Sequence, residues 1–582
     1  MNRQEWMRTA AVLGMFAIVF AILTVSSYVQ KSGTWDETSF VASGYVELKL
    51  RDYRLITEHP PFLREWNALP LLMLDHIDLN TNSAYWTAGK QYNFSHEFLY
   101  LRNDADRLLY RARFMTVLLG IALGILLFCW TRELFGFLPA VTVLGLYSVE
   151  PNILAHSSLV TTDLGLTCFI FGSLYFLWRT ARNFTLPNVC SLTTFFVLAQ
   201  VSKFTALLLW PIILLLLLLV VCRRASWPCR LCRSGEARSR AAKATMMIVI
   251  LASLAMASWV GTWAAYGFRY SPTPTDTERF HFRSTQVMRE MAPKLTALMN
   301  WVDDHHLLPN ACAQGLAFRM ASIQKRPAYL MGQYSDEGWW DYFLVAFLVK
   351  TPIAILLLFL GGVVLCLKQP AKLLIEGELF VLLPLTAALA MSTAAKTDIG
   401  VRHILPVYPM ALLLAGKCVC AMWNSGRKRY RFALAGLCLL AITETAFVYP
   451  DYLTFFNAAA GGPRNGDKLL VDSNLDWGQD LKGLKRWMDR NNVAHINLSY
   501  FGSADPAYYG IQCTYLPGSP FFAVPLIDHP QLPGYVAVSL SNLRWPSLKE
   551  EDRIFYRPFL ERKPVAVIGH SIRVYWVEQP WW

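Results

Sequence analysis

Long apolar stretches, separated by short polar loops, run through the first 450 residues of the chain. A helix that crosses a bilayer needs about 20 mostly apolar residues. Eleven stretches come close to that length and lie near residues 9–29, 112–130, 136–154, 162–179, 187–201, 204–222, 244–266, 342–366, 377–394, 404–421 and 432–450. Two pairs of spans have very short connections, so counts of ten and twelve stay open. The pattern predicts an α-helical polytopic membrane protein with about eleven transmembrane helices.

The basic residues test this arrangement. If Arg3 and Arg8 are cytoplasmic, alternation of the spans brings the dense basic loops to the same side, including 223–243 and 427–431. Cytoplasmic loops of membrane proteins carry an excess of Lys and Arg, which agrees with this count. The first span then reads as a retained signal-anchor helix, because no small-residue cleavage site follows it.

The other side of the membrane collects two long loops, residues 30–111 and 267–341, together with the C-terminal tail. The first loop contains the segment FLREWNALPLLMLD, which is apolar but too short to span and has charges at both ends. This pattern predicts a helix that lies in the plane of the membrane interface. The second loop, rich in Trp, His and Met, is expected to hold another such helix.

Composition narrows the functional classes. The chain has 582 residues, of which 54% are hydrophobic and 16% charged, too apolar for an ordinary soluble protein. The net charge of +13 lies largely in short loops between spans, and no nucleic-acid motif accompanies it, so we expect no nucleic-acid partner. Cysteines lie mostly in apolar spans, and the single CxxC of Cys229 and Cys232 is weak evidence for zinc.

After Pro450 the composition changes to that of an α/β domain. KLLVDSN, AHINLSYFG, YVAVSLSNL and PVAVIGHSIRVYWV have strand character, and LDWGQDLKGLKRWMDRNN has the rhythm of an amphipathic helix. Asp472, Asn474 and Asp476 alternate as in a calcium loop, but no Glu closes the loop, so a strand-end turn is the preferred interpretation. The sequence therefore predicts a membrane domain, residues 1–450, and a small extracytoplasmic α/β domain, residues 451–582.

Acidic residues in the first outer loop are the first candidates for chemistry. Asp36 and Glu37 follow the first span, and Glu58 and His59 precede two prolines that take the segment out of helix. A carboxylate here can act as a general base or help to hold a metal ion. The alternative is structural, because Thr34 and Glu37 have the spacing of a helix capping box.

Cations and a further acid lie on the same side. Asp163 opens the fourth span beside two threonines, which offer a helix-cap explanation. Lys203 interrupts an apolar run, where a lysine also snorkels to the interface. Arg402 and His403 sit at the mouth of the tenth span, near Lys396, and an arginine there can grip a phosphate with two N–H donors. One side of the membrane is thus expected to carry carboxylates that can act as a base and cations that can bind a phosphate leaving group.

With these motifs the chain resembles the GT-C superfamily of polytopic glycosyltransferases, which use lipid-phosphate sugars. The nearest branch holds the protein O-mannosyltransferases and aminoarabinose transferases, also called glycosyltransferase family 39 or phospholipid carrier-dependent glycosyltransferases. The resemblance covers about residues 1–450. It rests on WDE after the first span, HPP in the first loop, TTD at the fourth span, the lysine at 203 and the segment VRHILPVYP. The tail after residue 450 departs from the mannosyltransferases' appended sugar-binding module.

The resemblance implies a role for each candidate. Asp36 matches the family's first-loop catalytic acid and general base, Glu37 is its neighbour, and Asp163 matches the second acidic position. The residues implied in substrate binding are Glu58, His59, Lys203, Lys396, Arg402 and His403. The implied reaction is inversion at the anomeric carbon, in which the acceptor attacks as the lipid phosphate leaves. No cofactor is required, and participation of a divalent metal ion stays open.

The expected function is therefore a membrane glycosyltransferase that moves a hexose or pentose from a polyprenyl-phosphate donor to an extracytoplasmic protein, lipid or glycan acceptor. A transporter or flippase of a lipid-linked saccharide is the alternative, although no inverted repeat or paired broken helices are evident. A non-catalytic scaffold with the same fold is the third interpretation. The expected location is a bacterial inner membrane with a periplasmic active side.

Overall fold

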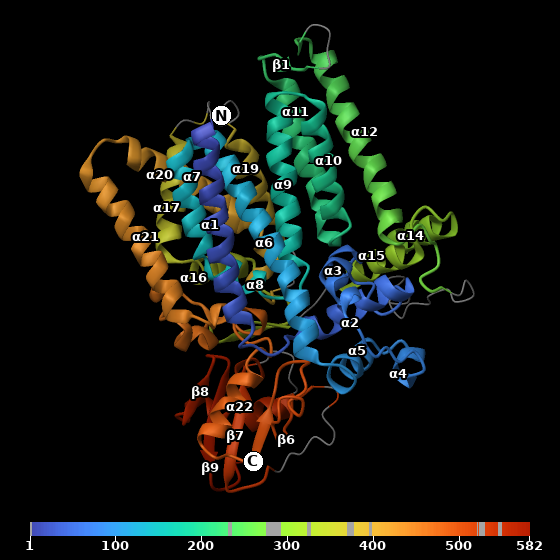
Figure 1. The fold of residues 1–582 in the computed structure, drawn as a ribbon, viewed down its shortest axis with the longest axis vertical. Coiled ribbons are helices and arrows are strands. Elements are labelled where there is room, and N and C mark those ends of the chain that lie inside the picture. Colours follow the sequence, from blue (N-terminus) through green and yellow to red (C-terminus); the bar gives the residue numbers. More distant parts are fainter. Residues whose placement is uncertain are drawn as a thin grey trace.

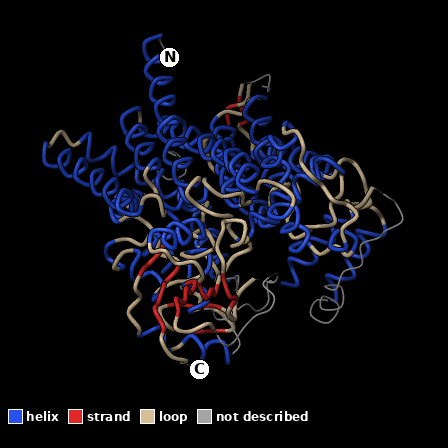
Figure 2. Tube along the Cα trace, turned by 60° about the horizontal axis from the view of Figure 1, so that its bottom comes forward, coloured by secondary structure: helices blue, strands red, loops and turns tan. Residues whose placement is uncertain are grey.

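A bundle of long helices carries a small mixed sheet at one end (Figure 1). The computed structural model describes residues 3–230, 235–274, 293–322, 327–368, 370, 377–394, 398–520, 522, 530–544 and 550–581. Lys396 and Cys232, which the sequence analysis singled out, lie outside these ranges. Figure 2 shows most of the strands gathered near the C-terminus, with helices making up the rest of the body.

Seven helical segments of the described chain are long and apolar enough to cross a membrane, and nine if two bent pairs each count as one span. The seven are α1 (Arg3–Tyr28), α6 (Ala105–Phe135), α9 (Asp163–Arg182), η3 with α11 (Phe204–Cys222), α12 (Arg240–Ala265), α20 (Val407–Asn424) and α21 (Lys428–Val448). Two shorter apolar helices, α10 (Leu186–Gln200) and α19 (Leu379–Ala394), complete the set. Each predicted span thus has a helical counterpart, and the protein is an integral membrane protein.

Two of the predicted spans are broken, so the sequence-based expectation that broken helices are absent is wrong. Helix α7 (Phe137–Ser148) meets α8 (Pro151–Ser157) at 63°, and α16 (Tyr342–Lys350) meets α17 (Ile353–Leu367) at 119°. A proline stands at each break, Pro151 and Pro352, and proline cannot donate the backbone hydrogen bond that would continue the helix.

The two long outer loops fold into short helices near the same end of the bundle (Figure 1). The first holds α2 (Trp35–Leu50), α3 (Phe62–Ala68), η1 (Leu69–Met73), α4 (Ala84–Thr87), α5 (Gln91–His96) and the π-helical turn η2 (Glu97–Leu101). The second holds α14 (Pro293–Asp304), α15 (Asn310–Ser322) and the hairpin of β3 (Ala328–Leu330) and β4 (Gln333–Ser335). Leu72 and Met73 are 47% and 85% exposed, which fits the interfacial helix predicted there. A second hairpin, β1 (Trp227–Pro228) with β2 (Glu236–Ala237), lies at the opposite end of the bundle (Figure 1).

The C-terminal sheet has the strand order β6-β5-β7-β9-β8. Strand β5 (Ile496–Ser499) is parallel to β6 (Cys513–Tyr515) and β7 (Gly534–Ser539), whereas β9 (Ile572–Val577) is antiparallel to β7 and to β8 (Ala566–Ile568). The helices of this part are α22 (Leu481–Arg490), α23 (Leu540–Leu543), α24 (Glu550–Tyr556) and α25 (Pro558–Glu561). The α/β character predicted for the tail is confirmed.

One predicted strand of the tail, KLLVDSN, is wrong. Residues 452–474 instead form the 3-10 turns η6 (Tyr452–Thr454), η7 (Ala458–Ala460), η8 (Pro463–Lys468) and η9 (Asp472–Asn474). The polar groups at the end of this stretch bond to the membrane bundle, since Asn474 accepts a hydrogen bond from the Val401 amide. A strand pairing within the sheet would withdraw these groups from the bundle.

A buried ion pair joins four segments where the first outer loop begins. Arg113, in the third turn of α6, donates to both carboxylate oxygens of Glu37 at 2.8 and 2.6 Å. The same guanidinium donates to the carbonyls of Tyr28 and Ser32, so it also holds the end of α1. The Glu37 carboxylate in turn accepts from the amide of Val160, just ahead of α9. Both charged side chains are fully buried.

Replacement of Arg113 by leucine is expected to destabilise the protein strongly. Removing one partner of a buried ion pair leaves an uncompensated charge and costs about 3–5 kcal/mol. The measurement is the midpoint of thermal unfolding in detergent. Arg111→Leu is the matched control, because Arg111 lies two residues away on α6 and is exposed; equal losses for the two variants would contradict the structural role.

Candidate active site

Two carboxylates from distant parts of the chain meet around one guanidinium group. Nη1 of Arg402 lies 2.8 Å from Oδ2 of Asp36 and 3.6 Å from Oδ2 of Asp163. The second Asp163 oxygen accepts from Nζ of Lys203 at 2.5 Å. Acids and bases therefore alternate in the order Asp36, Arg402, Asp163, Lys203, and each charge is next to one of opposite sign.

The four side chains come from the ends of helices. Asp36 lies in the first turn of α2, and Asp163 is the first residue of α9, where the positive end of a helix favours an acid. Lys203 lies at the break between α10 and η3, and Arg402 lies in the turn η5 (Val401–Ile404) ahead of α20. Only Asp36 keeps appreciable exposure, 26% of its side chain, so it is the accessible acid of the group.

Buried polar atoms without hydrogen-bond partners gather around this group. Within the described residues they include both ring nitrogens of His156, Nδ1 of His59, Oγ1 of Thr161, Oδ2 of Asp163 and Nε of Arg402. Buried polar groups are almost always hydrogen-bonded, because leaving one unpaired costs free energy. Several such atoms around paired charges are typical of a site that binds a polar ligand.

Arg64 shapes the loop that carries Glu58 and His59. Its guanidinium donates to Glu47 at 2.6 Å and to the carbonyls of Ile56 and His59 at 3.1 and 3.0 Å. Arg64 and Glu47 are each 1% exposed. This buried pair holds the proline-stiffened loop beside the site.

The pKa values of Glu58 and His59, the two loop side chains beside the site, are shifted from their usual values. Burial, together with nearby cations including Lys203, holds the pKa of His59 well below its usual value. Burial also raises the pKa of the half-buried Glu58, and the neighbouring Asp36 carboxylate adds to the shift. Both side chains carry hydrogen-bonding groups that a substrate beside Asp36 can use.

The structure brings together four of the predicted residues, Asp36, Asp163, Lys203 and Arg402, with Glu58 and His59 next to them. Glu37 is not among them, because both of its oxygens are engaged by Arg113, Thr34 and Val160. This arrangement agrees with the structural alternative drawn from the capping-box spacing and suits a positioning group better than a proton acceptor. His403 packs near the Phe343 ring, 6.5 Å between centroids.

Sequence reasoning missed several residues of the site. Trp477, from the tail, lies with its ring 4.2 Å from the Arg402 guanidinium. His156 is fully buried on α8 and interacts electrostatically with Asp163. The sequence feature that could have identified His156 is its position in a very short loop, seven residues before Asp163. For Trp477 no local signal exists, since its partner lies far away in the chain.

No group of three or more His, Cys, Asp and Glu side chains in the described ranges has the arrangement of a metal site. The tail residues that alternate as in a calcium loop form hydrogen bonds within the protein. Asp476 accepts hydrogen bonds from the amides of Ser541 and Gly478, and Asn474 donates to the Tyr342 hydroxyl. Burial raises the pKa of Asp476 to about 7, which disfavours the charge a cation would need.

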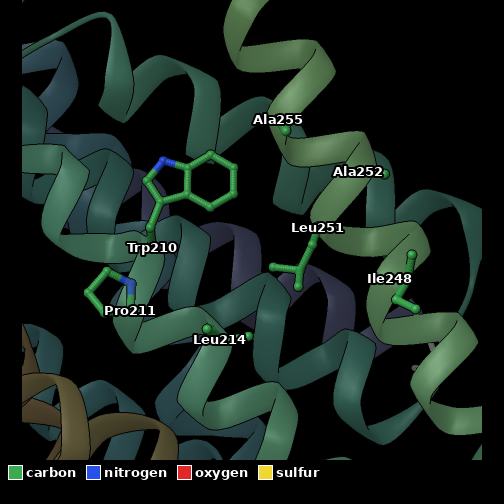
Figure 3. A pocket seen from close by; sticks show the side chains of 7 residues that line it. All are labelled: Trp210, Pro211, Leu214, Ile248, Leu251, Ala252 and Ala255. Carbon is green, nitrogen blue, oxygen red and sulfur yellow. The ribbon is translucent and has the colours of Figure 1, made fainter. Parts of the chain in front are cut away.

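An apolar groove lies between α11 and α12, the two helices that follow Lys203 in the chain (Figure 3). Its volume is about 630 Å³, and Figure 3 shows Trp210, Leu251 and neighbouring side chains along its walls. The residues that line it are Trp210, Pro211, Leu214, Ile248, Leu251, Ala252 and Ala255. Trp210 is seven positions after Lys203, so the groove begins close in sequence to the charged group.

Comparison with known proteins supports the resemblance drawn from the sequence. Residues 105–232 match the family described as dolichyl-phosphate-mannose-protein mannosyltransferase. This segment contains Asp163 and Lys203, and over it the predicted resemblance is confirmed. No curated protein matches the sequence significantly.

Three similar solved structures are distant in sequence. One is the Archaeoglobus fulgidus oligosaccharyltransferase tethered to an acceptor peptide, 12% identical, covering 76% of this chain and 55% of that one, with a TM-score of 0.41. The archaeal oligosaccharyltransferase AglB from Archaeoglobus fulgidus, in complex with an inhibitory peptide and a dolichol-phosphate, is 13% identical, covering 93% of this chain and 70% of that one, with a TM-score of 0.43. ArnT from Cupriavidus metallidurans, bound to undecaprenyl phosphate, is 12% identical, covering 97% and 98%, with a TM-score of 0.30. This chain thus spans about half the length of the first of them, and at this identity no residue role transfers.

Replacement of Arg64 by lysine is expected to loosen the loop of residues 52–61. Lysine keeps the charge but loses the planar fork that bonds Glu47 and two carbonyls at once. Hydrogen exchange of the loop amides should accelerate at least tenfold, while exchange in α9 should not change. Arg107→Lys, at an exposed position of α6, is the control, and unchanged loop exchange in Arg64→Lys would refute the role.

Proposed function

We propose that this protein is a membrane glycosyltransferase that moves a sugar from a polyprenyl-phosphate donor to an extracytoplasmic acceptor. One observation carries the proposal, namely that a partly exposed carboxylate, Asp36, shares a site with the partly buried cation Arg402 and the buried cation Lys203. A base and a phosphate-binding pair are the parts that glycosyl transfer from a lipid phosphate needs. The family match over residues 105–232 supports the same reaction class.

In the proposed reaction Asp36 accepts the proton of an acceptor hydroxyl or amine. The acceptor atom then forms a bond to the anomeric carbon as the bond from that carbon to the phosphate oxygen breaks. The lipid phosphate leaves with the bonding electrons on the opposite face. A single displacement inverts the anomeric carbon, so a β-linked donor gives an α-linked product.

Arg402 and Lys203 are proposed to hold the departing phosphate. Arg402 has a buried Nε without a hydrogen-bond partner among the described residues, and Lys203 lies beside it across Asp163. Charge-assisted hydrogen bonds from these donors stabilise the negative charge that develops on the leaving oxygen. Burial lowers the pKa of Lys203, and the Asp163 carboxylate opposes that shift.

The apolar groove between α11 and α12 is proposed to receive the lipid chain of the donor. Its walls carry no charged side chain, and it begins close in sequence to Lys203. We also propose a bacterial inner membrane location, a periplasmic active side and a hexose or pentose as the transferred sugar. Glu58 and His59 then face the acceptor, and Glu37 holds the helix that carries the base.

Replacement of Asp36 by asparagine is expected to abolish transfer while donor binding remains. Asparagine keeps the size of the side chain but cannot accept the proton, and loss of a general base typically lowers rates by about 10²–10⁴-fold. The measurement is the movement of label from radiolabelled polyprenyl-phosphate sugars to product in proteoliposomes. Asp78→Asn is the matched control, since Asp78 lies in the same outer loop with 53% of its side chain exposed.

Two outcomes would contradict the proposal. If neither the parent protein nor Asp36→Asn transfers label from a panel of hexose and pentose donors, the enzyme assignment fails. If both instead carry label across the bilayer at equal rates, the protein is a transporter of the lipid-linked saccharide.

Replacement of Lys203 by methionine is expected to weaken binding of polyprenyl monophosphate by about 10–100-fold, since hydrogen bonds to charged groups contribute about 1.5–3 kcal/mol. Binding to the purified protein can be followed by displacement of a fluorescent polyprenyl phosphate. Lys203→Arg, which retains the charge, should recover part of the affinity. Lys485→Met, on the outer surface of α22, should bind as the parent does, and an equal loss there would show that the effect is unspecific.

A further inference from the structure

The segment 473–479, which leads from the membrane bundle into the C-terminal sheet, is buried along its whole length. On one side it bonds to the start of the first outer loop. The carbonyl of Trp477 accepts from the Trp35 amide at 3.0 Å, and the carbonyl of Gln479 accepts from the Ser32 amide at 2.9 Å. These contacts hold the backbone immediately ahead of Asp36.

On its other side the same segment bonds to the loop that carries Arg402. Oδ1 of Asn474 accepts from the Val401 amide at 2.8 Å, and Oγ of Ser473 donates to the Ile399 carbonyl at 2.9 Å. The Trp477 ring then lies 4.2 Å from the Arg402 guanidinium. The backbone and the side chain of the arginine are thus both held by the tail.

We propose that residues 473–479 are a structural part of the active site, and that Trp477 and Asn474 are positioning residues for Arg402 and Asp36. Those two partners are separated by 366 positions in the chain, and this one segment contacts the backbone beside each of them. The inference rests on the proposed function, and it assigns to the tail a part in donor binding.

The chemistry of the two residues suits this role. An aromatic ring attracts a cation through its face without taking up an N–H donor. Arg402 therefore keeps its donors for Asp36 and for a phosphate, while the ring fixes the plane of the guanidinium. The ring itself is only 2% exposed, and the Trp477 amide donates to Oε1 of Gln479 at 2.8 Å, so its position is fixed in turn.

Asn474 is held in the same way. Its amide nitrogen donates to the Tyr342 hydroxyl at 2.9 Å and to the Val471 carbonyl at 3.0 Å, which directs Oδ1 toward Val401. Lys350 adds a hydrogen bond from its ammonium group to the Asn474 carbonyl at 2.6 Å. The loop ahead of Arg402 is consequently anchored to a rigid point on the bundle.

The test compares variants of the full-length protein by their affinity for polyprenyl monophosphate. Trp477→Leu is expected to lower affinity about tenfold, and Trp477→Phe, which retains a ring face, should stay within threefold of the parent. Trp487→Leu is the matched control, because Trp487 is a half-buried tryptophan on α22 of the same tail, away from Arg402. It should bind as the parent does.

A double-mutant cycle separates positioning from a general structural effect. In the Arg402→Lys background, where the planar cation is gone, Trp477→Leu should reduce affinity much less than tenfold. An equal loss in both backgrounds, or parent-like binding by Trp477→Leu, overturns the role of Trp477. If Trp477→Leu does not fold, Asn474→Leu should lose affinity. Asn474→Asp, which keeps the acceptor oxygen for the Val401 amide but loses the two N–H donors, should lose less of it; equal affinities of these two variants overturn the inference.

Failure of the proposed function gives a different result. In that case the parent protein itself binds no polyprenyl monophosphate, and both assignments fall together. Binding by the parent that the tail variants leave unchanged overturns the role of the tail alone.

Discussion

The site depends on the pairing of charges that have been taken out of water. A charge near the hydrocarbon of a membrane is expensive unless it has a partner. Asp163 sits between Lys203 and Arg402, and Arg402 sits between Asp163 and Asp36, so no member of the group is buried without an opposite charge. Because each of these ion pairs spans two elements, the arrangement also determines how helices α2, α9 and α20 meet.

Two neighbouring acids illustrate how burial separates structural from chemical roles. Both carboxylate oxygens of Glu37 accept hydrogen bonds and the side chain is fully buried, so Glu37 stabilises the packing of α1, α2 and α6. Asp36, one position earlier, points to the other side of the helix start and keeps a quarter of its side chain exposed. The tail also has a structural role. Asn474 accepts a hydrogen bond from the loop that carries Arg402, and the Trp477 ring packs against the Arg402 guanidinium.

Much of the fold could be predicted from the sequence, because the hydrophobic effect and the bilayer act on local segments. All eleven apolar stretches correspond to helices, and strands β5, β7, β8 and β9 overlap predicted strand segments. Strand β6 was not predicted, and the end of the segment YVAVSLSNL forms helix α23 instead. Pro151 and Pro352 are local sequence features that predict the two bends, although each of these stretches was predicted as one continuous span. The predicted strand at KLLVDSN failed because its polar groups bond to the bundle, which is information that a local pattern does not contain.

The sequence by itself identified residue types that are chemically suited to such a site and predicted that they gather on one side of the membrane, since both inferences follow from residue type and the alternation of spans. Only the tertiary structure decided which of them meet. Asp36 and Arg402 are separated by 366 positions, Glu37 is drawn away by Arg113, and Trp477 reaches Arg402 from the tail. Distances of a few ångströms between such residues result from helix packing and burial, which depend on the whole chain at once.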